Sequence, residues 1–310
     1  MDKTNQSAVT FFIIKGISDV PNLQVPLFLL ILLIYLFTLG GNLTILLLVC
    51  LDPHLHTPMY FFLVNLSIID MSSTTTTLHK ILLIFLTRNH VISYVDCLAQ
   101  FYFFACFANH EMLILTAMSY DRYVAICNPL GYQAIMNQRL CILLAAVCWL
   151  LGFIEVIPYV VLLSALSCYR SNTINHFYCD AIPITQLSCS DTSALQTVFL
   201  VEGMLIVGLG PLLLTILPYI FIISTILKIR TTTGRRKVFY TCSSHLTVVG
   251  LLHTTLIYQY MKPISADSVE YNKLLSLINT AAVPLLNPLI YSLKNKDVKS
   301  AFKKQVKMEE

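Results

Sequence analysis

Long apolar segments recur along almost the whole chain. A helix that crosses roughly 30 Å of bilayer hydrocarbon needs about 20 mostly apolar residues. Seven segments of the sequence meet this length, and they cover residues 26–50, 58–83, 97–121, 140–163, 196–228, 238–261 and 272–293. The pattern predicts an all-α membrane protein: a seven-transmembrane helix bundle over residues 26–293, with an N-terminal arm (1–25) before it and a tail (294–310) after it.

Several of the predicted spans contain polar residues at depth. The second holds Asp70 and a run of threonines that starts at Thr74, the third holds Glu111, and the seventh holds Asn287. Polar groups are costly inside a bilayer and usually face the interior of a bundle or a cavity. We therefore expect these three helices to line the interior of the bundle.

The composition excludes a water-soluble protein. Hydrophobic residues make up 56% of the 310 residues and charged residues only 12%, against roughly 25% charged residues in a soluble globular chain. These values exclude a soluble enzyme, a disordered chain and a compact nucleic-acid binder. The sequence also lacks the metalloprotease, hydrolase, phosphate-binding and dinucleotide-binding motifs of enzymes. A channel or transporter remains an alternative, although the sequence has no glycine-rich filter and no ladder of charges.

The distribution of basic residues predicts the orientation of the bundle. Most of the 20 Lys and Arg residues lie between spans five and six or after span seven, and Arg122 and Arg139 lie on the same side. Basic residues favour the cytoplasmic side of a membrane protein, so we expect a cytoplasmic C-terminus and an extracellular N-terminus. The triplet that begins at Asn5 is a glycosylation acceptor in that outer arm.

Four of the ten cysteines fall on the predicted outer side, where disulfides persist. They are Cys97, Cys168, Cys179 and Cys189, and four cysteines allow three pairings. A bridge from the loop between spans four and five to Cys97 would hold that loop over the mouth of the bundle. His176, Cys179 and Asp180 in this loop are also possible metal ligands, but a disulfide-bonded Cys179 has no thiolate, so we favour a structural role.

Two acidic residues lie deep in the predicted bundle. Asp70 belongs to the second span, and Glu111 lies between the two ends of the third. Buried carboxylates without partners are too costly to remain charged. We therefore predict a shared cation, with sodium the natural candidate and Ser or Asn oxygens completing its shell. A protonated hydrogen-bond network is the alternative. Glu155 and Glu202, the other acids within spans, suggest no defined role.

The third span also carries a candidate switch at its inner end. Phe104, Glu111 and Arg122 are separated by close to whole numbers of helical turns and therefore share one stripe. Asp121 directly precedes Arg122, and its carboxylate can fold back to hold the guanidinium. Such an ion pair at the membrane boundary could be released by protonation or by a cytoplasmic partner.

Five motifs occur in order along the chain. They are Gly41–Asn42, residues 55–70 (LHTPMYFFLVNLSIID), residues 118–132 (MSYDRYVAICNPLGY), residues 237–246 (KVFYTCSSHL) and residues 284–298 (PLLNPLIYSLKNKDV). With these motifs the chain resembles, over almost its whole length, vertebrate olfactory receptors, which are rhodopsin-like (class A) G-protein-coupled receptors. It departs from the family pattern at Ser119, where alanine is usual, and at Leu252–His253, where an aromatic pair is common.

The resemblance implies roles for individual residues. It implies the disulfides Cys97–Cys179 and Cys168–Cys189, and it makes Asp70 and Glu111 the acids of the sodium pocket. Arg122 would swing toward the G protein on activation. Tyr219 and Tyr291 would meet it in the active state.

Ligand pockets in helix bundles form between spans, and here we expect the outer third to hold one. The stripe of span three and the resemblance together predict an apolar lining with a few hydrogen-bonding groups, suited to a small hydrophobic ligand with one polar handle. The predicted ligand-binding residues are Phe104, Ala105, Ala108, Asn109, Met204, Val207, His253, Leu256, Ile257, Tyr260 and Thr280.

The tail has an amphipathic pattern. Val298, Ala301, Phe302 and Val306 recur at helical spacing among lysines, which predicts a short cytoplasmic helix against anionic lipid headgroups. A solvated basic tail is the alternative.

These features predict an odorant receptor in the plasma membrane, and the family resemblance implies the cilia of olfactory sensory neurons. We expect it to bind volatile odorants and to raise cAMP through a stimulatory heterotrimeric G protein. It would require no cofactor, with sodium a possible allosteric modulator, and it would bind membrane lipid but no nucleic acid. The alternative is a rhodopsin-like receptor for a non-odorant metabolite or acid in another tissue.

Overall fold

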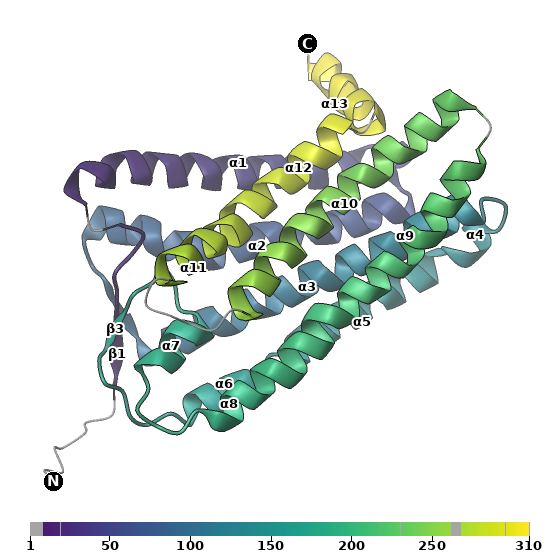
Figure 1. Cartoon of the computed structure of the whole chain (residues 1–310). Coiled ribbons are helices and arrows are strands. Elements are labelled where there is room, and N and C mark those ends of the chain that lie inside the picture. Colours follow the sequence, from purple (N-terminus) through teal and green to yellow (C-terminus); the bar gives the residue numbers. More distant parts are fainter. Residues whose placement is uncertain (1–8, 19, 230, 262–267, 295, 310) are drawn as a thin grey trace, which may run out of the picture.

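Seven long helical stretches run roughly along one direction (Figure 1). The computed structural model describes residues 9–18, 20–229, 231–261, 268–294 and 296–309. Three stretches are single helices near the N-terminus: α1 (Gln24–Leu51), α2 (Pro58–Thr87) and α3 (Tyr94–Cys127). The sixth is α10 (Thr232–Met261). The short helices η1 (Pro21–Leu23) and η2 (Pro53–Leu55) precede α1 and α2.

The other three stretches are interrupted. The fourth consists of α5 (Gln138–Ile154) and α6 (Ile157–Ser164). The fifth consists of α8 (Ser193–Val198), the π-helix η3 (Phe199–Leu209) and α9 (Gly210–Lys228). The seventh consists of α11 (Ser268–Leu277), the π-helix η4 (Ile278–Ala282) and α12 (Val283–Lys294). Sequence analysis predicts each as one continuous span.

A proline explains where each interruption ends. Pro158, Pro211 and Pro284 are the second residues of α6, α9 and α12. Proline has no N–H to donate and its ring clashes with a preceding helical turn, so it is accommodated best in the first turn of a new helix.

The observed helices extend beyond the apolar segments that predict them. Helix α3 begins at Tyr94 because the Ser93 hydroxyl caps it by accepting from the backbone N–H of Asp96 at 3.1 Å. Helix α2 ends at Thr87, and Arg88 follows in the left-handed region at φ 56°. Apolar content marks the part of a helix inside the membrane, whereas capping residues decide where the helix ends.

Five stretches in the described part of the chain are long and apolar enough to cross a membrane. They differ in burial: 11% of the most apolar window of α1 is buried, against 61% for α3. Helix α3 packs against α2, α5, α6, α9 and α10 and is therefore central, whereas α1 presents leucines such as Leu29, Leu33 and Leu36 outward.

A small sheet that sequence analysis does not predict lies at one end of the bundle. Strand β1 (Phe11–Ile14) lies between β2 (Val91–Ser93), its antiparallel partner, and β3 (Thr173–Ile174), its parallel partner. Phe12 and Ile14 are fully buried. We call this end, which also holds helix α7 (Ala181–Leu187), the disulfide end.

The opposite end of the bundle, the tail end, holds α4 (Tyr132–Ile135) and α13 (Lys296–Glu309) (Figure 1). Helix α13 contacts α1, α12 and η2. Val298 and Ala301 are buried, and Phe302 is half exposed. Part of the predicted apolar stripe thus packs on the bundle, while the side chain of Val306 lies outside the described residues.

Candidate functional site

Asp70 and Glu111 meet at one amide in the middle of the bundle. The side-chain nitrogen of Asn287 in α12 donates to both carboxylate oxygens of Asp70, at 3.1 and 3.0 Å, and to Oε1 of Glu111 at 3.2 Å. All three side chains are at most 4% exposed. The structure therefore brings together the two acids that the sequence pairs and adds Asn287, which the sequence marks only as a polar residue in span seven.

The donor set of this central cluster fits a sodium ion. Asn287 Oδ1 and Ser67 Oγ are buried and have no hydrogen-bond partner within the described part of the chain. Ser67 lies one helical turn before Asp70 and therefore on the same side of α2. Two carboxylates and two unpaired neutral oxygens are ligands that a hard cation prefers, and a cation would offset the repulsion between the acids.

At the tail end, Asp121 has a different partner from the one predicted. Its Oδ1 accepts a hydrogen bond from the Tyr132 hydroxyl at 2.7 Å, and Arg122 contacts the sulfur of Met59 in α2. Consecutive helix residues project in different directions, which lets the two side chains reach these separate partners. The predicted release of Arg122 from Asp121 stays a prediction.

A second contact at the tail end joins three helices. The Tyr219 hydroxyl of α9 is 2.8 Å from Nδ1 of His245 in α10, and Nε2 of His245 is 3.1 Å from the Leu115 carbonyl of α3. Because a carbonyl only accepts, Nε2 carries the proton and Nδ1 accepts from Tyr219. Tyr219 is thus hydrogen-bonded to His245. The side chain of Tyr291 lies outside the described residues.

The predicted ligand-binding residues have different packing partners. Phe104 packs edge-on against Tyr178 at a centroid distance of 4.8 Å, whereas Ala105 packs in the cluster that contains Val156, Tyr159 and Leu195. Adjacent residues of α3 project about 100° apart, so these two side chains pack against different neighbours. Asn109 is buried, while Ala108, Leu256 and Ile257 are half-buried. The side chains of Met204, Val207 and Tyr260 lie outside the described residues.

His253 has an unused hydrogen-bonding atom. Its Nδ1 is 3.0 Å from the Val249 carbonyl and must donate to it, which leaves Nε2 of a neutral ring as an acceptor. Nε2 is buried and has no hydrogen-bond partner in the described part of the chain. Thr280, in contrast, is satisfied, because its hydroxyl donates to the Ser276 carbonyl at 2.8 Å.

A polar chain toward the disulfide end was missed by sequence analysis. The Thr255 hydroxyl donates to Asn279 Oδ1, Asn279 donates to Gln259 at 3.3 Å, and Gln259 donates to Asp180 at 3.4 Å and to Ser276 at 2.9 Å. The signal was present, because Thr255 and Gln259 are four residues apart and share one face of a helix.

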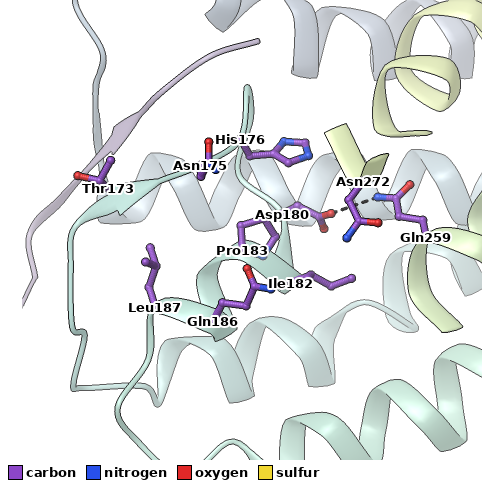
Figure 2. Close-up of a pocket in the computed structure, with 10 residues that line it drawn as sticks. All are labelled: Thr173, Asn175, His176, Asp180, Ile182, Pro183, Gln186, Leu187, Gln259 and Asn272. Atoms are coloured by element: carbon purple, nitrogen blue, oxygen red, sulfur yellow. Dashed lines mark hydrogen bonds between the residues drawn. The ribbon is translucent and has the colours of Figure 1, made fainter. Parts of the chain in front are cut away.

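Two disulfides fix the loop between α6 and α8. They join Cys97 to Cys179 and Cys168 to Cys189, the pairs that the family resemblance implies. Cys179 therefore offers no thiolate, and no group of three or more His, Cys, Asp or Glu side chains suited to a metal ion occurs among the described residues. His176 packs against Phe177 and Tyr178, and Asp180 accepts hydrogen bonds from the Ala181 backbone and from Gln259 (Figure 2).

This bundle of long apolar helices around a buried polar interior defines a helical membrane receptor. The sequence model of the family described as "Olfactory receptor" matches residues 31–308. Human olfactory receptor 6C3 is 45% identical over 302 residues, which cover 97% of each chain. Mouse olfactory receptor 5AR1 is 42% identical over 306 residues, 99% of this chain and 98% of the relative.

The chain therefore belongs to the olfactory receptor family. It is a multi-pass membrane protein of the G-protein-coupled class and not an enzyme. Family membership implies odorant ligands and coupling to a G protein.

Proposed function

We propose that this receptor binds small, mostly hydrophobic volatile odorants between its helices in the third nearest the disulfide end. The observation that carries this proposal is the buried, unpaired Nε2 of His253. Because buried polar atoms are nearly always paired, this acceptor calls for a donor from a ligand. The favoured odorant therefore has an apolar body and one hydrogen-bond donor, such as a hydroxyl group.

The bound odorant stabilises the state in which α10 is displaced and thereby shifts an existing equilibrium. Arg122, released from Met59, then engages the G protein, and Tyr219 and Tyr291 support it. Two contacts support this proposal, because each links two helices: Arg122 of α3 contacts Met59 of α2, and Tyr219 of α9 is hydrogen-bonded to His245 of α10. The G protein is of the stimulatory type and raises cAMP.

Sodium, bound by Asp70, Glu111, Asn287 and Ser67, favours the inactive state. Support comes from the convergence of two acids on one amide and from the unpaired oxygens beside them. The cation would hold α2, α3 and α12 together, so displacement of these helices would oppose its binding.

The receptor lies in the plasma membrane of olfactory cilia with its disulfide end outside. The basic residues of the tail, of the end of α9 and of the first turns of α10 support this orientation. Asn5, the candidate glycosylation site on the outer arm, lies outside the described residues.

A cAMP-reporter screen of chemically varied odorants on surface-expressed receptor tests the proposal, with Arg122→Ala as the signalling control. We expect a hydroxylated or otherwise donor-bearing odorant to respond, the Arg122→Ala response to be lost, and His253→Phe to raise the half-maximal concentration about tenfold, the equivalent of one hydrogen bond to a buried partner. A full response from Arg122→Ala would contradict the switch. An unchanged His253→Phe curve for every active odorant would contradict the binding site.

A further inference from the structure

Two acids of the fourth and fifth helical stretches take no part in the sites described above. Glu155 directly follows α5 and lies nine residues before the end of α6 at Ser164. Glu202 belongs to η3 and lies nine residues after the start of α8 at Ser193. At 1.5 Å per residue, both acids are about 14 Å from these helix ends. They therefore lie at the same depth, within the apolar segments that cross the membrane.

Tyr159 lies between the two acids. It follows Glu155 by one helical turn, and its ring packs against Phe199 at a centroid distance of 5.0 Å. Its hydroxyl oxygen is 3.2 Å from the position that a Cβ would take at Gly203, so it points at the turn that carries Glu202. Figure 1 shows α6 and α8 side by side. The charges of the two acids act on each other and on this hydroxyl. We call Glu155, Tyr159 and Glu202 the acidic face.

The acidic face lacks partners within the described part of the chain. Tyr159 is 6% exposed and the two glutamates are half-buried, yet among the described residues no hydrogen bond or ion pair engages the Tyr159 hydroxyl or either carboxylate. The two stretches offer no cation of their own, because residues 140–163 and 193–227 contain no Lys, Arg or His. Polar groups inside a bilayer are normally paired. We therefore expect the partner to come from another molecule.

The surroundings of the acidic face are apolar and open to the lipid side. Apolar residues on the same turns of both stretches are 47–65% exposed, and they are Ile154, Ile157, Val161, Leu200, Val201 and Leu205. Because each glutamate is only half-buried, a side chain that approaches among these residues can reach it. A second helix on this face would cover the apolar residues and contact the polar groups together.

One arginine satisfies all three polar groups. A guanidinium carries several N–H donors in a planar fork, so it can donate to both carboxylates and to the Tyr159 hydroxyl oxygen. Lysine is a more strongly hydrated point charge and fits such a pair less well. A second copy of this chain is disfavoured, because a two-fold-symmetric contact places the same face on both copies and would bring two pairs of carboxylates together.

We propose that the acidic face is the docking site for a transmembrane helix of a different membrane protein that carries an arginine within its span, about 14 Å below its outer end. The guanidinium pairs with Glu155 and Glu202, and the apolar side chains of the docked helix cover the exposed residues around them. The proposal goes beyond the proposed function, because the acidic face contains none of the predicted ligand-binding residues and needs neither an odorant nor a G protein.

Photo-cross-linking in lipid vesicles tests the site on purified full-length receptor. The probe is a synthetic leucine–alanine helix of about 20 residues, with one arginine at the matching depth and a benzophenone one turn away. We expect this peptide to cross-link at least about tenfold more receptor than the same peptide with leucine in place of arginine, because charge-assisted hydrogen bonds are strong. Mass spectrometry should place the cross-links in residues 138–164 and 193–209. The double variant Glu155→Gln/Glu202→Gln should lose the excess, and Asp191→Asn, an exposed acid outside the face, should keep it.

A milder variant and the peptide series keep the test decisive if the double variant does not fold. Tyr159→Phe retains the ring and removes the hydroxyl, so it should reduce the excess about threefold. A peptide with glutamate in place of arginine should cross-link no more than the leucine peptide.

Three results would overturn the proposal. They are equal cross-linking by the arginine and leucine peptides, an undiminished excess in folded Glu155→Gln/Glu202→Gln, and receptor dimers trapped by oxidation at Val161→Cys but not in wild type, which would make a second copy the occupant. Since the assay contains neither odorant nor G protein, failure of odorant signalling would leave its result unchanged.

Discussion

The two ends of the bundle are held together by different kinds of interaction. At the disulfide end, two covalent bridges, a three-stranded sheet and the buried side chains of Phe12 and Tyr178 fix the loops on the helices. Toward the tail end, hydrogen bonds between side chains, such as Tyr132–Asp121 and Tyr219–His245, join neighbouring elements. The proposed mechanism, in which the odorant binds near the disulfide end and the tail end rearranges, benefits from this difference, because individual hydrogen bonds can be exchanged at little cost.

Removing the longer disulfide should have the largest effect. Cys97 and Cys179 are 82 residues apart and Cys168 and Cys189 are 21 apart. The chain-entropy relation gives about 4.5 kcal/mol for the first loop and about 3.3 kcal/mol for the second. We expect Cys97→Ser/Cys179→Ser to abolish surface expression and Cys168→Ser/Cys189→Ser to reduce it. Flow cytometry measures both, with Cys50→Ser, an exposed free cysteine, as control. Equal losses would contradict the ranking.

The central cluster should set how sodium acts on signalling. Asp70→Asn or Glu111→Gln removes one charge from the proposed cation site without contacting the odorant. With a coupling of about 1–3 kcal/mol, typical between linked sites, replacing sodium by N-methylglucamine should shift the odorant response of wild type about tenfold and leave both variants unchanged. Membrane assays of nucleotide exchange measure this. Wild-type sodium dependence in both variants would remove the cation from the mechanism.

A glycine pair tests how tightly α3 and α5 are packed. A Cβ at Gly152 would lie 2.4 Å from the His110 ring, whereas a Cβ at Gly250 would meet no atom within 4 Å. His110 is fully buried and is 2.7 Å from the Trp149 carbonyl, so it cannot move freely. Gly152→Ala should therefore destabilise the receptor by about 1–3 kcal/mol, and Gly250→Ala should stabilise it by up to about 1 kcal/mol. Thermal unfolding in detergent compares the stability of the two variants with that of wild type. A Gly152→Ala variant as stable as wild type would show that α3 and α5 are loosely packed at His110.

The smallest effect is expected at the tail end. Tyr132→Phe removes only the hydroxyl that donates to Asp121. The lost hydrogen bond is worth about 1 kcal/mol. If this bond stabilises the inactive state, its loss should raise basal cAMP by up to about fivefold. Tyr120→Phe is the matched control, since Tyr120 is 39% exposed. Burial and the Asp121 charge raise the pKa of Tyr132, so this hydroxyl stays protonated and the effect should not change between pH 6 and pH 8. Unchanged basal cAMP would mean that the bond does not restrain the switch.

The membrane-spanning segments could be predicted from the sequence because the length of an apolar segment is a local property. The interruptions of the fourth, fifth and seventh helical stretches could also have been predicted, since Pro158, Pro211 and Pro284 each lie in the first turn of a new helix. The three-stranded sheet could not be predicted, because Phe11–Ile14 is a short apolar segment whose partner strands lie far along the chain.

In the candidate sites, too, some contacts could be predicted from the sequence and others could not. The pairing of Asp70 with Glu111 follows from their depth in two helices, so the sequence could suggest it. The contact of Tyr132 with Asp121 depends on the path of the loop that carries α4, and the partner of Gln259 depends on where the long loop places Asp180. Loop conformation has no periodic signature, so neither contact could be predicted.

The central position of β1 has a consequence for biosynthesis. Ile14 leaves the ribosome about 160 residues before Ile174, its partner in β3, a delay of roughly 10–30 seconds at 5–20 residues per second. During this interval, the edge of β1 that pairs with β3 has no partner strand. We therefore expect that a chaperone that covers residues 11–14 until β3 has been made would favour folding of the receptor.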